Sequence, residues 1–165
     1  MNHKITELSK KITSYAPKAD IEVLKKAYKF SKEYHKGQKR ASGEPYITHP
    51  VAVAEILAEL KLDPPSVIAG LLHDTVEDTA ATHKDIKAYF GEEIAHLVQG
   101  VTKLSRIEIQ SNLDKHAENF RKFILAISTD IRILLIKLAD RLHNMRTIHH
   151  ITSQESQKRI ALETL

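Results

Sequence analysis

The stretch Ser66–Asp78 has the sequence SVIAGLLHDTVED, and it both predicts the fold and draws attention to a site. Its first half carries no charge, which favours a helix that enters the core. On a continuing helix, His73 and Glu77 share one face, and Asp74 and Asp78 share the adjoining face. Three carboxylates so close together repel one another unless a positive charge lies among them. The pattern indicates either a divalent-cation site with mixed imidazole and carboxylate ligands or a solvated, acidic helix end.

A second stretch, Ile131–Thr147, has the sequence IRILLIKLADRLHNMRT. Its nearly apolar first half predicts a buried helix. Asp140, Asn144 and Thr147 follow at helical spacing and lie on one face. An ionised carboxylate on a core helix needs a partner, because an unpaired charge is strongly disfavoured in the interior. Asp140 therefore either pairs with a neighbouring basic side chain or contributes to a site.

A third stretch, Lys39–Pro50, has the sequence KRASGEPYITHP. Glycine and proline prevent the preceding helix from continuing through it. Thr48-His49-Pro50 is typical of a helix start, because proline is tolerated in the first turn. A basic pair, a glycine-containing loop and a histidine at a helix start suit phosphate binding beside a metal. An ordinary basic loop is the alternative interpretation.

The rest of the chain also shows helical periodicity. Five glycines and five prolines separate the periodic segments, and strand-like alternation never extends beyond a few residues. We therefore predict an all-α protein, a single domain over residues 1–165 with roughly seven to nine helices. The expected helices cover about residues 21–36, 48–60, 64–78, 83–91, 92–103, 114–128 and 130–148, and a last one begins near residue 153.

Three of the expected helix starts carry capping signals. Asp20 is predicted to be an N-cap, and Asp63 precedes Pro64-Pro65 at the start of the next apolar helix. Thr82 followed by Asp85 resembles a capping box in which aspartate replaces the usual glutamate or glutamine.

Composition limits the chemistry and the surroundings of the protein. The 165 residues include no cysteine, so disulfides and thiolate metal sites are excluded and any metal must be held by His, Asp and Glu. The chain has neither a signal-peptide apolar region nor an apolar run long enough to span a membrane. We therefore predict a cytoplasmic protein without a membrane segment.

The formal net charge of +4 and the isoelectric point near 9.2 favour anionic partners. This excess is modest, and solvated helix faces alone would explain it. A nucleic-acid surface more often combines a dense basic stripe with exposed aromatic residues, whereas only 5% of these residues are aromatic and none is tryptophan. A small phosphorylated ligand is the favoured anion, and nucleic acid is not expected as a partner.

Together the three stretches contain a spaced set of histidines and aspartates, and the set resembles the H…HD…D signature of the HD phosphohydrolase superfamily: His49, His73, Asp74 and Asp140. The surrounding sequence motifs resemble those of the hydrolase domain of the bifunctional Rel/Spo alarmone enzymes: SGEPYITHP (42–50), LLHDTVEDT (71–79), LVQGVTKL (97–104), AENFRK (117–122) and LIKLADRLHNMRT (135–147). YAPKAD (15–20) and ALETL (161–165) match as well. The resemblance covers essentially the whole chain and implies the helical HD-domain fold.

The resemblance implies a specific reaction. By similarity to the family, one Mn²⁺ would be bound by His49, His73, Asp74 and Asp140. Glu77 and Asp78 match the family's ED motif, whose carboxylates orient or deprotonate the attacking water, and which of the two takes the proton stays open. The reaction would be hydrolysis of (p)ppGpp at the ribose 3′ position in the stringent response, giving pyrophosphate and GDP or GTP.

The resemblance also implies substrate contacts. Arg40 and Ser42 match the family's nucleotide-binding loop, and Asn144 and Thr147 match residues that line the guanosine pocket. Lys103, in the GVTKL segment, would contact a phosphate. Ala41 stands where the family varies and is sometimes basic, so any contact it made to the base would be weaker. The other basic residues of these motifs are expected to form ion pairs or to support the site.

Bifunctional members of the family carry a synthetase domain and regulatory domains after the hydrolase. The final helix stops at residues 160–165 without a capping glycine, so we expect either the N-terminal fragment of a longer enzyme or a naturally shortened protein. The sequence does not indicate an oligomeric state.

Two other classes of function are considered. A non-catalytic alarmone-binding module would not need the acidic pair, so the presence of Glu77 and Asp78 favours an enzyme. An HD enzyme with another substrate, such as NADPH or a nucleoside triphosphate, would keep the metal residues and change the pocket. A helical nucleic-acid-binding domain has the least support from composition.

Overall fold

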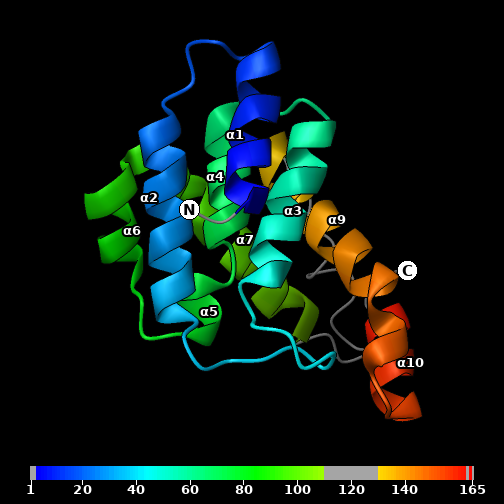
Figure 1. The fold of residues 1–165 in the computed structure, drawn as a ribbon. Helices are drawn as coiled ribbons and strands as arrows, with labels where there is room; N and C mark the ends of the chain where they lie inside the picture. Colours follow the sequence, from blue (N-terminus) through cyan, green and yellow to red (C-terminus); the bar gives the residue numbers. More distant parts are fainter. Residues whose placement is uncertain (1–2, 110–129, 163, 165) are drawn as a thin grey trace.

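Helices account for every regular element in the residues that the computed structural model describes, which are 3–109, 130–162 and 164 (Figure 1). The prediction of an all-α fold is therefore confirmed. The expected helix over residues 114–128, with the AENFRK motif, lies outside the described residues. The helices are α1 (His3–Tyr15), α2 (Ile21–Tyr34), α3 (Thr48–Glu59), α4 (Pro64–Leu72), α5 (Thr75–Asp78), α6 (His83–Phe90), α7 (Glu92–Ile109), α9 (Ile131–Arg146), the 3₁₀ helix η2 (Ile148–His150) and α10 (Gln154–Leu162).

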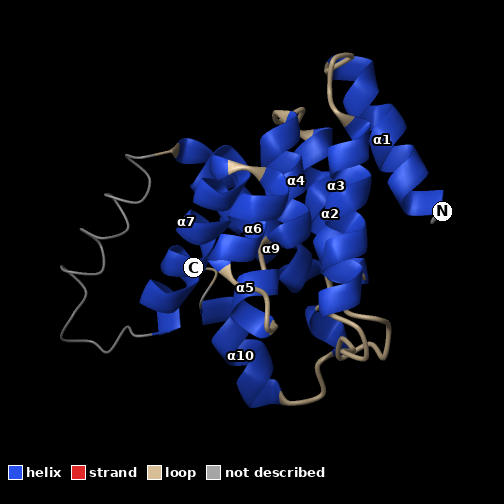
Figure 2. Cartoon of the chain, turned by 90° about the vertical axis from the view of Figure 1, so that its left-hand side faces the viewer, coloured by secondary structure: helices blue, strands red, loops and turns tan. Residues whose placement is uncertain are grey.

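Helix α4 lies at the centre of the fold, as its uncharged sequence predicts. Every residue from Ser66 to Leu72 is buried, and the helix packs against α2, α3, α7 and α9 (Figures 1 and 2). Gly70 allows α3 and α4 to approach closely, since an added β-carbon would lie 2.6 Å from the Leu57 Cδ1 atom. The chain therefore leaves the core at the C-terminal end of α4, where the polar cluster begins.

Helix α9 is buried on one side only. Ile133, Ile136 and Ala139 belong to the core, and the helix packs against α3, α4 and α7. The Asp130 carboxylate accepts a hydrogen bond from the Arg132 backbone N–H and so caps the helix. The buried side continues to Asp140, and the apolar half of α9 thereby carries a carboxylate into the interior.

The predicted capping signals are largely as expected. Asp20 accepts from the backbone N–H groups of Glu22 and Val23, and Thr82 and Asp85 form the reciprocal capping box. The carboxylate of Asp63 occupies the N-cap position of α4 but makes no capping hydrogen bond. It accepts instead from the Ser66 hydroxyl and from Arg132 of α9, so this side chain joins two helices.

The helix that the sequence predicts through residue 78 is interrupted after Leu72. The Thr75 hydroxyl donates to the Leu72 carbonyl at 2.6 Å, and α5 starts afresh from the Asp74 carbonyl. Consecutive residues on a regular helix point about 100° apart. At this break the adjacent side chains of His73 and Asp74 nevertheless converge, with 2.9 Å between His73 Nε2 and Asp74 Oδ1.

Two further helix boundaries differ from the expectation. Helix α1 was not assigned from the sequence, yet Ile5, Leu8 and Ile12 place it on the core beside α3. Helix α7 continues to Ile109, beyond the expected end near Lys103. Near the chain end, α10 packs against α9 and η2 (Figure 1). Over the described ranges, every helix is too short or too polar to cross a lipid bilayer.

Candidate active site

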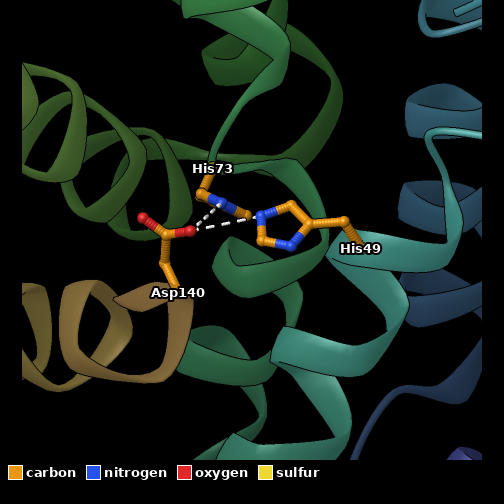
Figure 3. Close-up of side chains that lie close together, drawn as sticks. All are labelled: His49, His73 and Asp140. Atoms are coloured by element: carbon orange, nitrogen blue, oxygen red, sulfur yellow. Dashed lines mark ion pairs between the residues drawn. The ribbon is translucent and has the colours of Figure 1, made fainter. Parts of the chain in front are cut away.

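Three separate elements bring the predicted metal-binding residues together. His49 lies in the first turn of α3, His73 and Asp74 lie in the turn after α4, and Asp140 lies in α9. Figure 3 shows the side chains of His49, His73 and Asp140 turned toward one another. One ligand atom from each lies within 4.8 Å of the others, and all three residues are buried.

The distances place Asp74 beside this group as a fourth donor. The Oδ1 atom of Asp140 lies 3.2 Å from His49 Nε2 and 3.7 Å from His73 Nε2. The carboxylate of Asp74 spans the same two nitrogens, with Oδ1 2.9 Å from His73 Nε2 and Oδ2 3.4 Å from His49 Nε2. Two imidazoles and two carboxylates therefore face one point at the end of the core.

The nitrogen of His73 that faces this point is suited to bind a cation. Its Nδ1–H donates to the Gly70 carbonyl at 2.8 Å, which leaves Nε2 as the lone-pair nitrogen of a neutral ring. Nε2 is buried and has no hydrogen-bond partner, since its short distance to Asp74 lacks hydrogen-bond geometry. A buried lone pair among carboxylates is what a divalent ion would satisfy, and this donor set suits Mn²⁺, Fe²⁺ or Zn²⁺.

Electrostatics agree with a cationic centre. Burial alone would raise the pKa of Asp74 and of Asp140, but the neighbouring histidines hold both pKa values well below the ordinary range. Burial lowers the pKa of His73, yet Asp74 and Asp140 outweigh burial and raise it well above its ordinary value. Without metal, a proton on His73 balances the carboxylates. A bound cation would displace that proton, because a ligating imidazole is neutral.

The other predicted ligand histidine, His49, contacts a third imidazole. His49 Nδ1 lies 2.8 Å from Nδ1 of His143, which is half-buried on α9. Burial, followed by the charges of His49 and Arg40, lowers the pKa of His143 to about 4. His143 is therefore neutral near pH 7.

The acidic pair lies on α5, next to the metal-binding group. Burial, and then the charge of Asp74, raises the pKa of both Glu77 and Asp78. The Tyr46 hydroxyl lies 2.7 Å from Asp74 Oδ2 and 3.0 Å from Asp78 Oδ2, so one phenol connects a metal-binding carboxylate to the acidic pair. A carboxylate with a raised pKa is a better proton acceptor, which suits a general base.

The buried ring of His35 holds Tyr46 in place. Its ring stacks on His35, with 4.5 Å between ring centroids and 19° between ring planes. His35 Nδ1 lies 2.7 Å from Gln38 Oε1, and the Gln38 amide donates to the Asp78 carbonyl at 2.9 Å. The loop before α3 is thereby joined to α5.

A cleft of about 1330 Å³ opens beside the cluster. The acidic pair, Asp74 and Asp140 line it together with five basic residues: Arg40, Lys137, Arg141, Lys158 and Arg159. Lys137 is buried and donates to Asp140 Oδ2 at 3.1 Å and to the Ser105 hydroxyl at 2.9 Å. The last two basic residues belong to α10, which forms part of the cleft wall. Such a cleft combines a cation site with positive charge for an anionic ligand.

A smaller cavity of about 360 Å³ adjoins the cleft, since both are lined by Arg40, Tyr46, Arg141 and Asn144. Ser42 and Thr147 also line the smaller cavity. Arg40 donates to Asn144 Oδ1 at 2.9 Å and approaches Thr147 Oγ1 at 3.5 Å. Lys103 is exposed on α7 and lines neither cavity. Its phosphate contact stays a prediction.

Comparison with known proteins now places the chain in a family. The model of the HD domain family matches residues 27–165. The chain belongs to the HD domain family. The resemblance inferred from the motifs is confirmed, and with it the enzyme class, a phosphohydrolase domain of the HD type.

Relatives of this HD domain include long bacterial enzymes. A GTP pyrophosphokinase of Myxococcus xanthus is 55% identical over 157 residues, covering 93% of this chain and 21% of that protein. The bifunctional (p)ppGpp synthase/hydrolase SpoT of Escherichia coli K12 is 51% identical over 158 residues, covering 96% of this chain and 22% of that protein. A guanosine-3′,5′-bis(diphosphate) 3′-pyrophosphohydrolase of Escherichia coli O157:H7 has the same identity and coverage. The chain spans about a fifth of the length of these relatives.

Two solved structures are similar to this HD domain. A metazoan ortholog of SpoT, described as hydrolysing ppGpp and playing a role in starvation responses, superposes with a TM-score of 0.65 at 28% identity, covering 86% of this chain and 83% of that chain. A Listeria monocytogenes protein superposes with a TM-score of 0.51 at 32% identity, covering 74% and 79%. Both likenesses extend over most of the helical fold.

The structure adds residues to this HD domain's site that the sequence did not single out. Tyr46 lies inside the SGEPYITHP motif, three residues before His49, so its position in the sequence could have identified it as a site residue. Lys158 and Arg159 resemble an ordinary solvated helix face in the sequence. Only the packing of α10 against α9 brings them to the cleft.

Proposed function

We propose that this HD domain is a Mn²⁺-dependent 3′-pyrophosphohydrolase that degrades (p)ppGpp in the stringent response, in the cytoplasm and without nucleic-acid partners. One observation carries the proposal. Donor atoms of His49, His73 and Asp140 converge beside Asp74 and an acidic pair, at a cleft that five basic side chains also line. A relative 51% identical to this chain is named for this hydrolysis.

The metal would be held by His49, His73, Asp74 and Asp140. Bound there, Mn²⁺ would lower the pKa of a water molecule and offset the negative charge of a phosphate oxygen. The chain's own contribution is a pre-oriented donor set. The Nδ1–H of His73 donates to the Gly70 carbonyl, so the ring is already oriented with Nε2 toward the other donors, and metal binding has only to displace the Nε2 proton.

Glu77 and Asp78 take the role of proton acceptors. Both carboxylates line the cleft, and burial and the charge of Asp74 raise their pKa values above the ordinary values. General bases work best when their pKa is near the working pH. Either carboxylate would accept a proton from the attacking water, and single variants at the two positions separate their contributions.

The two cavities suit the two ends of an alarmone. Arg40, Ser42, Asn144 and Thr147 would bind the guanosine in the smaller cavity, with Arg40 also 5.6 Å above the Tyr46 ring. The basic residues of the larger cleft would bind phosphates, and Lys103 would add a phosphate contact from α7. In this arrangement the 3′-diphosphate would lie toward the acidic pair and the base away from it.

The proposed reaction is a hydrolysis, and water is the only reactant it needs besides the alarmone. Water adds to the phosphorus attached to the ribose 3′ oxygen, and the bond between that phosphorus and that oxygen breaks. The hydroxyl of the water leaves with pyrophosphate, and the ribose oxygen takes a proton. The products are GDP from ppGpp and GTP from pppGpp.

The test is the release of pyrophosphate from ppGpp by the purified chain, with Mn²⁺ present and with Mn²⁺ chelated. We expect turnover only with the metal. An absence of metal-dependent pyrophosphate release would contradict the proposal, and tight ppGpp binding without turnover would indicate a binding module instead. Parallel assays with NADPH and nucleoside triphosphates decide whether the substrate is the alarmone.

We further propose that residues 1–165 act as a single hydrolase domain. Buried apolar residues from α1 through α9 form one contiguous cluster in the described part of the chain. Since α3, α4 and α9 of this cluster also carry the metal-binding residues or lead into them, the core and the site are expected to fold and unfold together.

A further inference from the structure

The contact between His49 and His143 joins two imidazole nitrogens. The two Nδ1 atoms lie 2.8 Å apart, with 4.9 Å between ring centroids and 49° between ring planes. His49 is only 1% exposed, so water does not replace this contact easily. Figure 3 shows one ring nitrogen of His49 turned toward Asp140, and Nδ1 is the other.

Only one direction of this hydrogen bond is compatible with a bound cation. A nitrogen that ligates a metal presents its lone pair, so Nε2 of His49 must be unprotonated. A neutral ring then carries its proton on Nδ1, and this N–H must donate. The acceptor is Nδ1 of His143, which must therefore carry its own proton on Nε2.

We propose that His143 is a positioning residue that holds His49 in the metal-ligating tautomer and orientation. The inference rests on the metal centre of the proposed function, but it is independent of the substrate. It assigns His143 a role toward His49 rather than toward the guanosine, although His143 also lines the smaller cavity.

The support of the other ligand histidine explains why His143 matters. His73 donates its Nδ1–H to a backbone carbonyl, that of Gly70, which no side-chain substitution removes. His49 depends on a side chain from another helix. Removing that side chain leaves a buried N–H without an acceptor, which favours other ring orientations and the other tautomer. Loss of such a support lowers metal affinity by about 10- to 100-fold in comparable sites.

The experiment is a Mn²⁺ titration of the intact chain by calorimetry or by electron paramagnetic resonance of free Mn²⁺. His143→Leu keeps the approximate volume and removes the acceptor. His143→Asn keeps an acceptor, because its Oδ1 lies close to the position of the imidazole Nδ1. His149→Leu is the matched control, since His149 is exposed, lines neither cavity and packs its ring against that of His150.

We expect His143→Leu to lower Mn²⁺ affinity by about 10- to 100-fold. His143→Asn should stay within about threefold of the wild type, because the acceptor remains. His149→Leu should match the wild type. Circular dichroism melts establish that each variant is folded, and His143→Ala replaces the leucine variant if leucine prevents folding.

Two results would overturn the inference. One is wild-type Mn²⁺ affinity in a folded His143→Leu, or in His143→Ala if that variant takes its place. The other is an asparagine variant that binds Mn²⁺ as weakly as the leucine variant. In the hydrolysis assay, a positioning role raises the Mn²⁺ concentration needed for activity, whereas a substrate contact raises the KM for ppGpp instead. If the wild type binds Mn²⁺ but does not hydrolyse ppGpp, the proposed function fails and this inference still stands.

Discussion

His73 and His49 present the same nitrogen to the same carboxylate, but the molecule supports them in different ways. His73 bonds to a carbonyl three residues earlier and lies next to Asp74, so this half of the site is local in sequence. His49 bonds to His143, 94 residues away on another helix. The local half needs only α4 and the turn after it, whereas the remote half requires α3 and α9 to be packed together.

Because the two histidines are supported differently, substitutions in the two halves of the site should act in different ways. A change within the local half alters a ligand or the acidic pair directly. A change in the remote half alters the relative placement of two helices, or the tautomer of one ring.

The largest effect is expected from removing a ligand in either half. His73→Ala should lose Mn²⁺ binding and hydrolysis together, with affinity falling by more than the roughly 100-fold seen for outer supports. His49→Ala should be equally damaging, because the two nitrogens are equivalent toward a cation despite their different supports. Calorimetric Mn²⁺ titration and pyrophosphate release measure both losses. A His73→Ala variant that still binds Mn²⁺ with wild-type affinity would show that the ion is held elsewhere.

The next effect separates chemistry from metal binding within the local half. Glu77→Ala should keep Mn²⁺ affinity close to that of the wild type while kcat falls by roughly 100- to 10,000-fold, because a general base is lost. Asp78→Asn is the matched variant for the second carboxylate. The measurements are kcat and the Mn²⁺ dissociation constant. Full activity of Glu77→Ala would refute its role as the base.

A smaller effect is expected where the two halves meet. The Tyr46 hydroxyl, from the loop before α3, contacts Asp74 and Asp78 of the local half. Tyr46→Phe keeps the stacking on His35 and removes only the hydroxyl, so we expect about a 10-fold loss of Mn²⁺ affinity or of kcat. A double variant with His143→Leu tests whether both side chains act on one centre. Strictly additive losses would indicate independent roles.

The smallest expected effect is a change in the pH dependence of stability. Without metal, the pKa of folded His73 is raised well above its ordinary value of 6.5, so its contribution is fully present below pH 6.5 and is lost as the pH rises through the folded-state pKa. With Mn²⁺, a rising pH removes the competing proton and strengthens binding. The melting temperature measured in chelator should therefore fall as the pH rises from 6.5 through the folded-state pKa of His73. The melting temperature measured in excess Mn²⁺ should not fall over the same range. Parallel slopes in the two conditions would contradict the proposed exchange of proton and metal.

Several features of the fold were predictable because they depend on short-range interactions. The capping box at Thr82 and Asp85 and the N-cap at Asp20 involve groups within three residues of each other. The uncharged run of α4 predicted a central helix. The break after Leu72 was not predicted, because residues 71–78 contain no glycine or proline and the Thr75 hydroxyl alone gave little warning.

Residue types and local periodicity were enough to predict the helical class, and the family resemblance of the motifs predicted the metal-binding residues His49, His73, Asp74 and Asp140 and the acidic pair. The packing of the helices had to be known before these side chains could be seen to face one point, His143 to contact His49, and α10 to contribute basic side chains to the cleft. These two kinds of feature differ in how far apart along the chain the interacting residues lie. A hydrogen bond within one turn follows from the backbone, whereas contacts across about ninety residues depend on how apolar helix faces pack, which no spacing along the chain specifies.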